Sequence, residues 1–156
     1  MPVTVGVNFL TVVHKTSNGI TIAFPDICLT PAPPAPPIPI PYPNIAMSQD
    51  TAQGSSSVMA DGNPICLANS NFSRSTGDEA GTNKGVASGT NMGKAEFISY
   101  SFDVKVEGKG VARALDLMLH NNKNTPPFPL IQPSLITVPP MPETSGPWNL
   151  KVMVLD

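Results

Sequence analysis

The chain is poor in charge and in cysteine, and each shortage excludes a class of protein. Charged residues make up 13% of the 156 residues and the formal net charge is −2, so no basic surface is available for the phosphate backbone that dominates nucleic-acid affinity. Two cysteines cannot build a disulfide framework. The longest apolar runs, such as residues 131–138, are far shorter than the ~20 residues that span a bilayer. We therefore expect neither a nucleic-acid binder nor stable membrane insertion.

The N-terminal segment lacks the basic start, the long apolar centre and the small-residue cleavage site of a secretory signal. A hydrophobic content of 40% with few charges is typical of a chain that folds, and the length suits one domain. We expect a single folded unit that would leave the cell, if it does, without a cleaved signal peptide.

Proline and glycine are abundant instead. Nineteen prolines and twelve glycines make long helices improbable and favour short strands joined by fixed turns. Residues 31–43, PAPPAPPIPIPYP, hold eight prolines, which suits a flexible linker, a ligand for a proline-binding module, or a rigid part of the fold. The interleaved Ile38, Ile40 and Tyr42 and the absence of lysine and arginine favour the third interpretation. We expect a stiff apolar rod laid against the core.

Three segments have the pattern of a β-hairpin. They are residues 9–24 around Asn18-Gly19, 56–68 around Asp61-Gly62 and 97–115 around Glu107-Gly108, and each turn dipeptide tolerates the positive φ of a tight hairpin. The second and third share a loose pattern, an acidic residue and glycine followed by an aliphatic residue. This similarity predicts an internal pseudo-threefold repeat.

The glycine-rich stretch 75–97 does not carry the chemistry of a phosphate-binding loop. Its glycines recur every four residues, but no Gly-Lys-Ser or Gly-Lys-Thr ending follows them. Successive tight turns are the better interpretation. Within them, Asp78 and Glu79 are expected in a solvated turn or in contact with Arg74. No nucleophile elbow is present, and no catalytic residue is predicted.

Four side chains are soft metal ligands: His14, Cys28, Cys66 and His120. Their number and type would fill one tetrahedral zinc site with two cysteines and two histidines. Their spacing contains no paired motif, so two packed or disulfide-bonded cysteines with two ordinary histidines remain the alternative.

Three long motifs resemble the PAAR-like family known as DUF4150. They are FPDICLTP (24–31), IPIPYPNIA (38–46) and STGDEAGTNKGVASGTNMGKAEF (75–97). The resemblance implies a small β-rich cone whose broad base caps the trimeric, β-helical VgrG-type spike of a type VI secretion system or a related contractile injection system. It also implies a zinc ion, held by histidine and cysteine, near the sharp end.

Together these observations predict a mainly β fold: a small PAAR-like cone of short β-hairpins with a pseudo-threefold base and Pro/Gly-rich loops. Residues 1–124 are expected to form the tip domain and 125–156 a proline-rich C-terminal extension. The predicted function is non-enzymatic: one copy caps each spike trimer, sharpens it for membrane piercing and helps to deliver an effector. We expect zinc at His14, Cys28, Cys66 and His120, and a location in the bacterial cytoplasm before export on the spike.

Two other functions stay open. An adaptor would link an effector to the spike through the proline-rich segments. A small metal-dependent hydrolase would use the same four ligands, although four protein ligands leave no open position for water.

Overall fold

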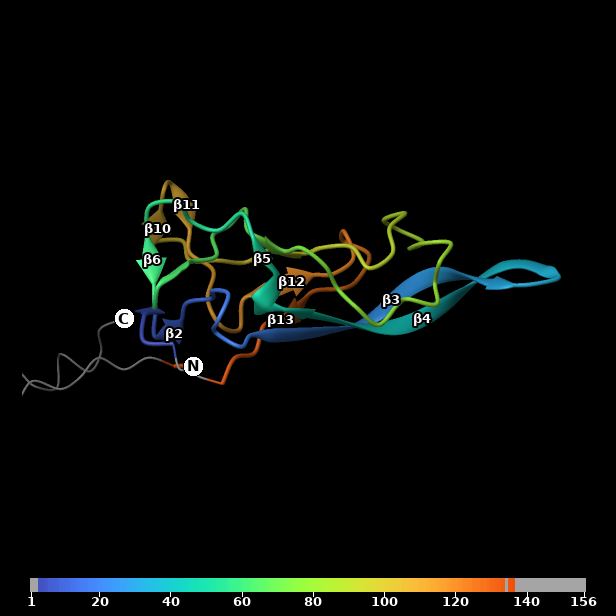
Figure 1. Ribbon diagram of the computed structural model, residues 1–156, viewed down its shortest axis with the longest axis horizontal. Coiled ribbons are helices and arrows are strands. Elements are labelled where there is room, and N and C mark those ends of the chain that lie inside the picture. The colour runs from blue at the N-terminus through green and yellow to red at the C-terminus, as the bar shows by residue number, and fades with distance from the viewer. Residues whose placement is uncertain (1–2, 134, 137–156) are drawn as a thin grey trace, which may run out of the picture.

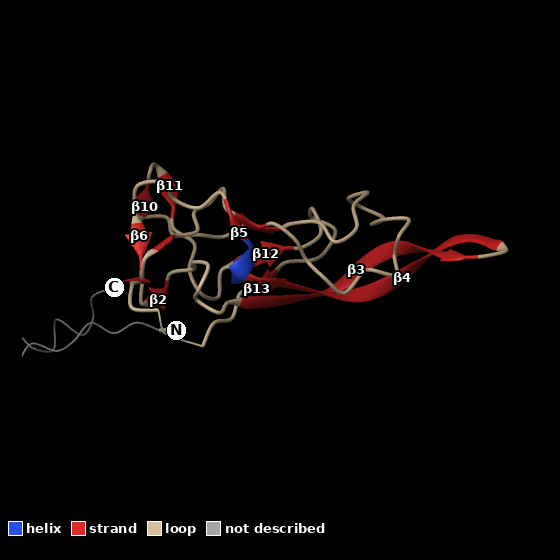
Figure 2. Ribbon diagram, viewed as in Figure 1, coloured by secondary structure: helices blue, strands red, loops and turns tan. Residues whose placement is uncertain are grey.

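The computed structural model describes residues 3–133 and 135–136. The body is elongated, broad at one end and drawn out into a long hairpin at the other (Figure 1). It is mainly β, with one 3-10 turn, η1, at Ser48–Asp50 (Figure 2), so the predicted fold class is confirmed. In the described part of the chain no helix is long and apolar enough to cross a membrane.

Within residues 3–133 the strands form one small sheet and four separate hairpins. The sheet has the order β13-β12-β9-β8-β5 and is antiparallel where the strands pair. Its strands are β5 (Thr51–Ala52), β8 (Asn71–Phe72), β9 (Ala95–Phe97), β12 (Leu117–Leu119) and β13 (Phe128–Pro129). The long hairpin pairs β3 (Ile20–Ala32) with β4 (Ala35–Met47). The three short hairpins are β1 (Gly6–Val7) with β2 (Leu10–Thr11), β6 (Met59–Ala60) with β7 (Asn63–Pro64), and β10 (Lys105–Val106) with β11 (Lys109–Gly110).

The three short hairpins are copies of one unit and lie at the broad end of the body, opposite the tip of the long hairpin (Figure 1). Each has two residues per strand and a two-residue turn with positive φ at both positions, the requirement of a type I′ turn. The turns are Asn8-Phe9, Asp61-Gly62 and Glu107-Gly108. The unit recurs at residues 6–17, 59–70 and 105–116, which confirms the predicted pseudo-threefold base.

Backbone contacts close the three repeats into a ring. After each hairpin the chain makes two isolated bridges two residues apart, and the bridges join the repeats in a cycle: His14 with Ile65, Leu67 with Val111, and Arg113 with Val12. The amide of Cys66 donates to the carbonyl of Val13 at 2.8 Å, and the amide of Ala112 donates to that of Cys66 at 3.0 Å. The amide of Ala114 returns to the carbonyl of Thr11 at 2.8 Å. No repeat is therefore an end of the array.

Side-chain hydrogen bonds at the hairpin turns join the three repeats in the same cyclic order. The residue two positions before each first strand contacts the turn of the next repeat. Thr4 donates to Asp61 through its amide at 3.1 Å and through its hydroxyl. Ser57 donates to Glu107 at 2.8 Å and 2.7 Å. The side-chain amide of Asn8 donates to Asp103 Oδ1 at 3.2 Å. Each hairpin turn is thus fastened to a neighbouring repeat.

Equivalent positions of the repeats fill two cores. Val12, Ile65 and Val111 are buried in a cluster at the base. One residue further on, Val13, Cys66 and Ala112 are buried in the central cluster beneath the sheet. Cys66 thus stands where the other repeats carry valine and alanine, and burial raises the pKa of its thiol to about 12. Its place in the fold is that of a packing residue.

The prediction for the first hairpin is wrong. Residues 9–24 do not pair with themselves; the first repeat turns earlier, at Asn8-Phe9, and Asn18-Gly19 lies just before β3, the first strand of the long hairpin. Gly19 instead exchanges hydrogen bonds with Ser48 across the start of that hairpin. The strand after Gly19 finds its partner in residues 35–47 because the chain continues extended for thirteen residues before it turns.

The proline run is part of the fold, but it does not lie flat against the core. Residues 35–43 of β4 are mostly exposed, and only its last residues, from Asn44 on, reach buried positions. The run forms the outer half of the long hairpin, which projects away from the base (Figure 1). The expectation of a rod packed on the core is thus corrected to a projecting strand.

Residues 125–133, the start of the predicted extension, pack on the body. Phe128–Pro129 form β13, Leu130 is buried in the central cluster, and the side-chain amide of Gln132 donates to Thr11 Oγ1 at 2.8 Å and to the carbonyl of Val12 at 3.1 Å. Residues 134 and 137–156 lie outside the described part of the chain.

We predict that Cys66 tolerates the residue of its sister repeat. Cys66→Val should change the free energy of unfolding by no more than about 1.5 kcal/mol, because the swap keeps an apolar side chain of similar size. Cys66→Ser should cost more, about 1–3 kcal/mol, because it buries a hydroxyl group. Urea unfolding checks both variants. Equal damage from valine and serine would show that the sulfur does more than pack.

A second prediction concerns Gly77, which has φ +131° and lies so close to β4 that a Cβ would stand 2.1 Å from the carbonyl oxygen of Pro43. Gly77→Ala should lower the free energy of unfolding by more than about 2 kcal/mol. The matched control is Gly89→Ala, where φ is +66° but no atom lies within 4 Å, with an expected cost of about 1 kcal/mol. Equal costs at the two sites would mean that the backbone at Gly77 moves freely away from β4.

Candidate metal centre on the long hairpin

Two acidic side chains and one thiol meet on the inner face of the long hairpin. Asp26 and Cys28 come from β3, and Asp78 comes from the glycine-rich loop after β8. Their ligand atoms lie within 4.8 Å of one another, and all three residues are fully buried. Among the described residues this is the group of three or more side chains that could hold a metal ion.

Strand geometry and two glycines position the group. Asp26 and Cys28 are two residues apart, so both side chains point to the same face of β3, opposite Tyr42 and Ile40 of β4. The loop can bring Asp78 onto that face because Gly81 passes against Cys28: a Cβ on Gly81 would lie 2.3 Å from the Cβ of Cys28. A larger residue there would push the loop, and Asp78 with it, off the strand.

Hydrogen bonds from two further segments hold the group. The thiol of Cys28 donates weakly to Asp26 Oδ1 at 3.5 Å and to Asp78 Oδ2 at 3.7 Å. Asn121 and Asn124 donate their side-chain amides to Asp26 Oδ1, and the amide of Met92 donates to both oxygens of Asp78 at 3.2 Å. The centre therefore ties β3 to the glycine-rich loop and to the segment after β12.

Burial keeps protons in the centre. Burial, and then the charges of Asp26 and Asp78, raise the pKa of the Cys28 thiol to about 12. Burial and a hydrogen bond with Asp26 raise the pKa of Asp78 to about 7. A divalent cation would replace these protons with a stronger positive charge, and carboxylate and thiolate are both established metal ligands. The Asp26, Cys28 and Asp78 group can therefore bind a metal ion.

The structure does not bring the four predicted zinc ligands together. Only Cys28 belongs to the group. His14 lies in the first repeat at the base, where its Nε2 is 3.1 Å from Asp61 Oδ2. Cys66 lies in the central core beside Thr51. The four side chains are separated because the repeats place His14 at the base and Cys66 in the central core, away from the long hairpin.

His120 is buried and has an unpaired ring nitrogen, but it is not a member of the Asp26, Cys28 and Asp78 group. It is fully buried, its Nε2 is 3.1 Å from Thr21 Oγ1, and its Nδ1 has no hydrogen-bond partner among the described residues. Burial lowers the pKa of His120 to about 4, against the opposing effect of the Asp26 charge. The imidazole is therefore neutral at pH 7, the form in which histidine binds metals.

Two members of the centre were missed in the sequence. Asp26 stands in the same motif as Cys28, and strand alternation is a signal that would have paired them. Asp78 was expected in a solvated turn or beside Arg74; instead it is buried, and Arg74 contacts Asp50 at 3.4 Å. No local signal predicts the burial of Asp78, because it depends on how the glycine-rich loop packs against Cys28, fifty residues earlier in the chain.

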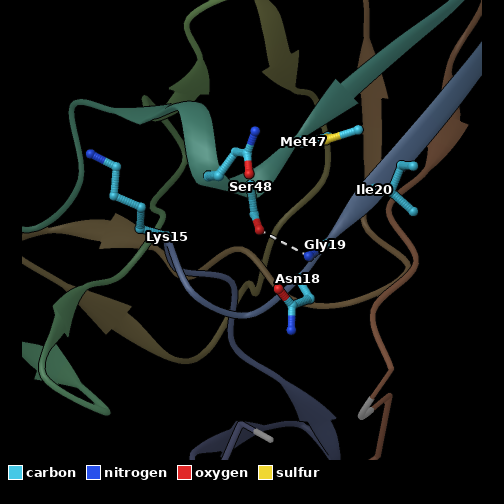
Figure 3. A pocket seen from close by; sticks show the side chains of 7 residues that line it. Lys15, Asn18, Gly19, Ile20, Met47 and Ser48 are labelled. Carbon is cyan, nitrogen blue, oxygen red and sulfur yellow. Dashed lines mark hydrogen bonds between the residues drawn. The ribbon is translucent and has the colours of Figure 1, made fainter. Parts of the chain in front are cut away.

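A shallow hollow lies where the base meets the long hairpin (Figure 3). Its volume is about 250 Å³, and the amide of Gly19 donates to Ser48 Oγ within it at 2.8 Å (Figure 3). Its lining residues are Lys15, Asn18, Gly19, Ile20, Met47, Ser48 and Gln49. The lining carries one charged group and no set of converging polar side chains, so the hollow is not assigned as a site.

The chain is similar to the DNase toxin Tse7 of Pseudomonas aeruginosa. The two are 40% identical over 133 residues, which cover 78% of this chain and 34% of Tse7. The chain thus spans about a third of the length of this relative. No solved structure matches the chain.

This similarity corrects the prediction of a non-enzymatic protein. The relative is by name an enzyme, a DNase toxin, and the absence of a catalytic motif in the sequence was therefore not a sound basis for excluding enzymatic activity. The resemblance to PAAR-like proteins, in contrast, is confirmed. The family described as toxin PAAR-like domain matches residues 19–127, which include the long hairpin, the metal centre and the second and third repeats. The chain belongs to the toxin PAAR-like domain family.

Proposed function

We propose that this chain caps the trimeric VgrG-type spike of a type VI secretion system, one copy per trimer. The three-hairpin base would sit on the trimer and the long hairpin would point away from it, sharpening the spike for membrane piercing. The observation that carries the proposal is the closed cycle of three equivalent repeats at the broad end.

Symmetry supports this assignment. A trimer presents three equivalent surfaces around its axis, and a single chain can meet all three equally only if it carries three equivalent elements of its own. The repeats at 6–17, 59–70 and 105–116 supply them. Short strands at the base can also continue the strands of a β-helical partner through main-chain hydrogen bonds.

The toxin family supports a role in delivery. A tip related to a DNase toxin would be made in the bacterial cytoplasm, loaded onto the spike and exported with it, together with a toxic activity carried by the same protein or by a bound effector. The spike would then provide the route out of the cell.

The stoichiometry tests the proposal. Native mass spectrometry of the purified chain mixed with a VgrG-type trimer should show one chain per trimer. Glu107→Ala should weaken this complex, because Glu107 fastens the third turn to Ser56 and Ser57. Glu79→Ala removes an exposed acid from the glycine-rich loop after β8 and should leave capping unchanged. Two or three chains per trimer would contradict the proposal.

A C-terminal truncation distinguishes the adaptor function from the tip function. Because residues 125–133 are built into the body, the deletion must begin after residue 136. A tip shortened at this point should still cap the spike. An adaptor that works through its C-terminal proline-rich segment should lose its partner, and loss of spike binding on this deletion would favour that function.

We also propose that zinc is the ion of the metal centre, with Asp26, Cys28 and Asp78 as ligands and His120 as the predicted residue available to complete the set. Zinc accepts oxygen, sulfur and nitrogen donors in four-coordinate structural sites. Bound there, it would pin the projecting hairpin to the loop and the segment after β12, which stiffens the sharp end.

Elemental analysis checks this proposal. The purified chain should contain about one zinc per molecule, the stoichiometry of a single structural site. Cys28→Ser and Asp78→Asn should lose most of it. The matched control is Cys66→Ser, which alters the other buried cysteine and should keep its zinc. Zinc that survives both Cys28→Ser and Asp78→Asn, or that disappears with Cys66→Ser, would place the ion elsewhere.

A further inference from the structure

One face of the long hairpin is apolar along its whole length. Cross-strand partners share a face, and the partners on the outer face are Ile20 with Met47, Ile22 with Ile45, Ile27 with Pro41, and Leu29 with Pro39. Several are well exposed: Ile22 by 53%, Met47 by 39% and Ile27 by 38%. A soluble protein rarely leaves so long an apolar surface uncovered unless something binds there.

Charge is missing from this hairpin. Residues 20–47 contain one charged side chain, Asp26, and it is buried on the inner face with the metal centre. The outer face therefore offers nothing to an acidic or basic partner, and it loses no ion hydration when it enters an apolar medium.

The prolines remove the backbone donors from the free edge of β4. In an antiparallel pair, alternate residues point their N–H groups away from the partner strand. Leu29 directs its N–H and C=O groups away from β4, because they pair with Lys84 and Asn83 of the loop. The backbone groups of its cross-strand partner Pro39 therefore also face away from the partner strand. Ile45 lies an even number of residues from Pro39, and its N–H and C=O groups also face outward, where they pair with those of Thr76. Residues 37, 39, 41 and 43 share this parity, and all four are proline.

The free edge of β4 limits which kind of partner could bind the long hairpin. A partner protein or second copy that added a strand to β4 would need outward N–H groups at these positions, and none exists. On β3, the carbonyl of Ile27 is already paired with Val86, and both backbone groups of Leu29 are paired with Asn83 and Lys84. Hydrocarbon offers neither charge nor hydrogen-bond partners, and it penalises every backbone N–H or C=O group that is left unpaired; at these four prolines only the C=O groups are left.

We propose that the outer face of the long hairpin is a contact surface for the acyl chains of a lipid bilayer. The inference rests on the proposed function, because only a tip that leads the spike would bring this face to a membrane. The alternating prolines would let an edge strand enter hydrocarbon without stranded donors, and the buried Asp26 group would keep the hairpin stiff.

Vesicle flotation tests the inference. The full chain should float with uncharged phosphatidylcholine vesicles, which exclude binding through charge. Ile27→Asp should weaken partitioning about tenfold or more, because a carboxylate is costly in hydrocarbon. The matched control is Ile98→Asp, at a similarly exposed isoleucine (44%) on the flank of the sheet, and it should partition like the native chain. Ile22→Asp provides a second substitution on the face, and thermal unfolding verifies that each variant folds.

The same proteins are assayed for spike capping, so that the two proposals fail separately. A native chain that caps the spike but does not float overturns the lipid face and leaves the tip function standing. A chain that floats through this face but does not cap overturns the tip function. Flotation unaffected by Ile27→Asp and Ile22→Asp also overturns the lipid face, and loss of a protein complex in those variants would then assign the face to a protein partner.

Discussion

The fold depends on the backbone hydrogen bonds that join the three repeats in a cycle. Val13, Cys66 and Ala112 each take part through a carbonyl or an amide, and their side chains fill the centre of the ring. Short hairpins of two residues per strand have little stability alone. Closure gives each one a neighbour on both sides, and the sheet and the long hairpin are built outward from that ring.

The candidate metal centre depends in turn on close backbone approaches. Gly77 lies against Pro43 and Gly81 lies against Cys28, so the glycine-rich loop follows β3 and β4 without side chains between them. This contact buries Asp78 beside two strand residues and supplies the partners for the outer edge of β3. The two glycines thus position the candidate metal ligands without supplying a ligand themselves.

The sequence predicted the fold where the local rules were strong. Asp61-Gly62 and Glu107-Gly108 are typical sequences for the turns that they form. Asn8-Phe9 is not, because it places a phenylalanine at φ +70°, where glycine is expected. The sequence therefore predicted the first turn at Asn18-Gly19 and not at Asn8-Phe9. Cys28 was predicted as a ligand and lies in the candidate group, and strand alternation could have added Asp26. Asp78 was not predictable, since its burial depends on tertiary contacts of the loop.

Carrying three repeats in one chain has a genetic consequence. In a ring of three identical subunits, one codon change alters three positions around the axis, and any loss of stability is incurred three times. Here the equivalents Thr11, Pro64 and Gly110 are three different residues. One side of the base can therefore be altered by mutation while the other two sides stay unchanged.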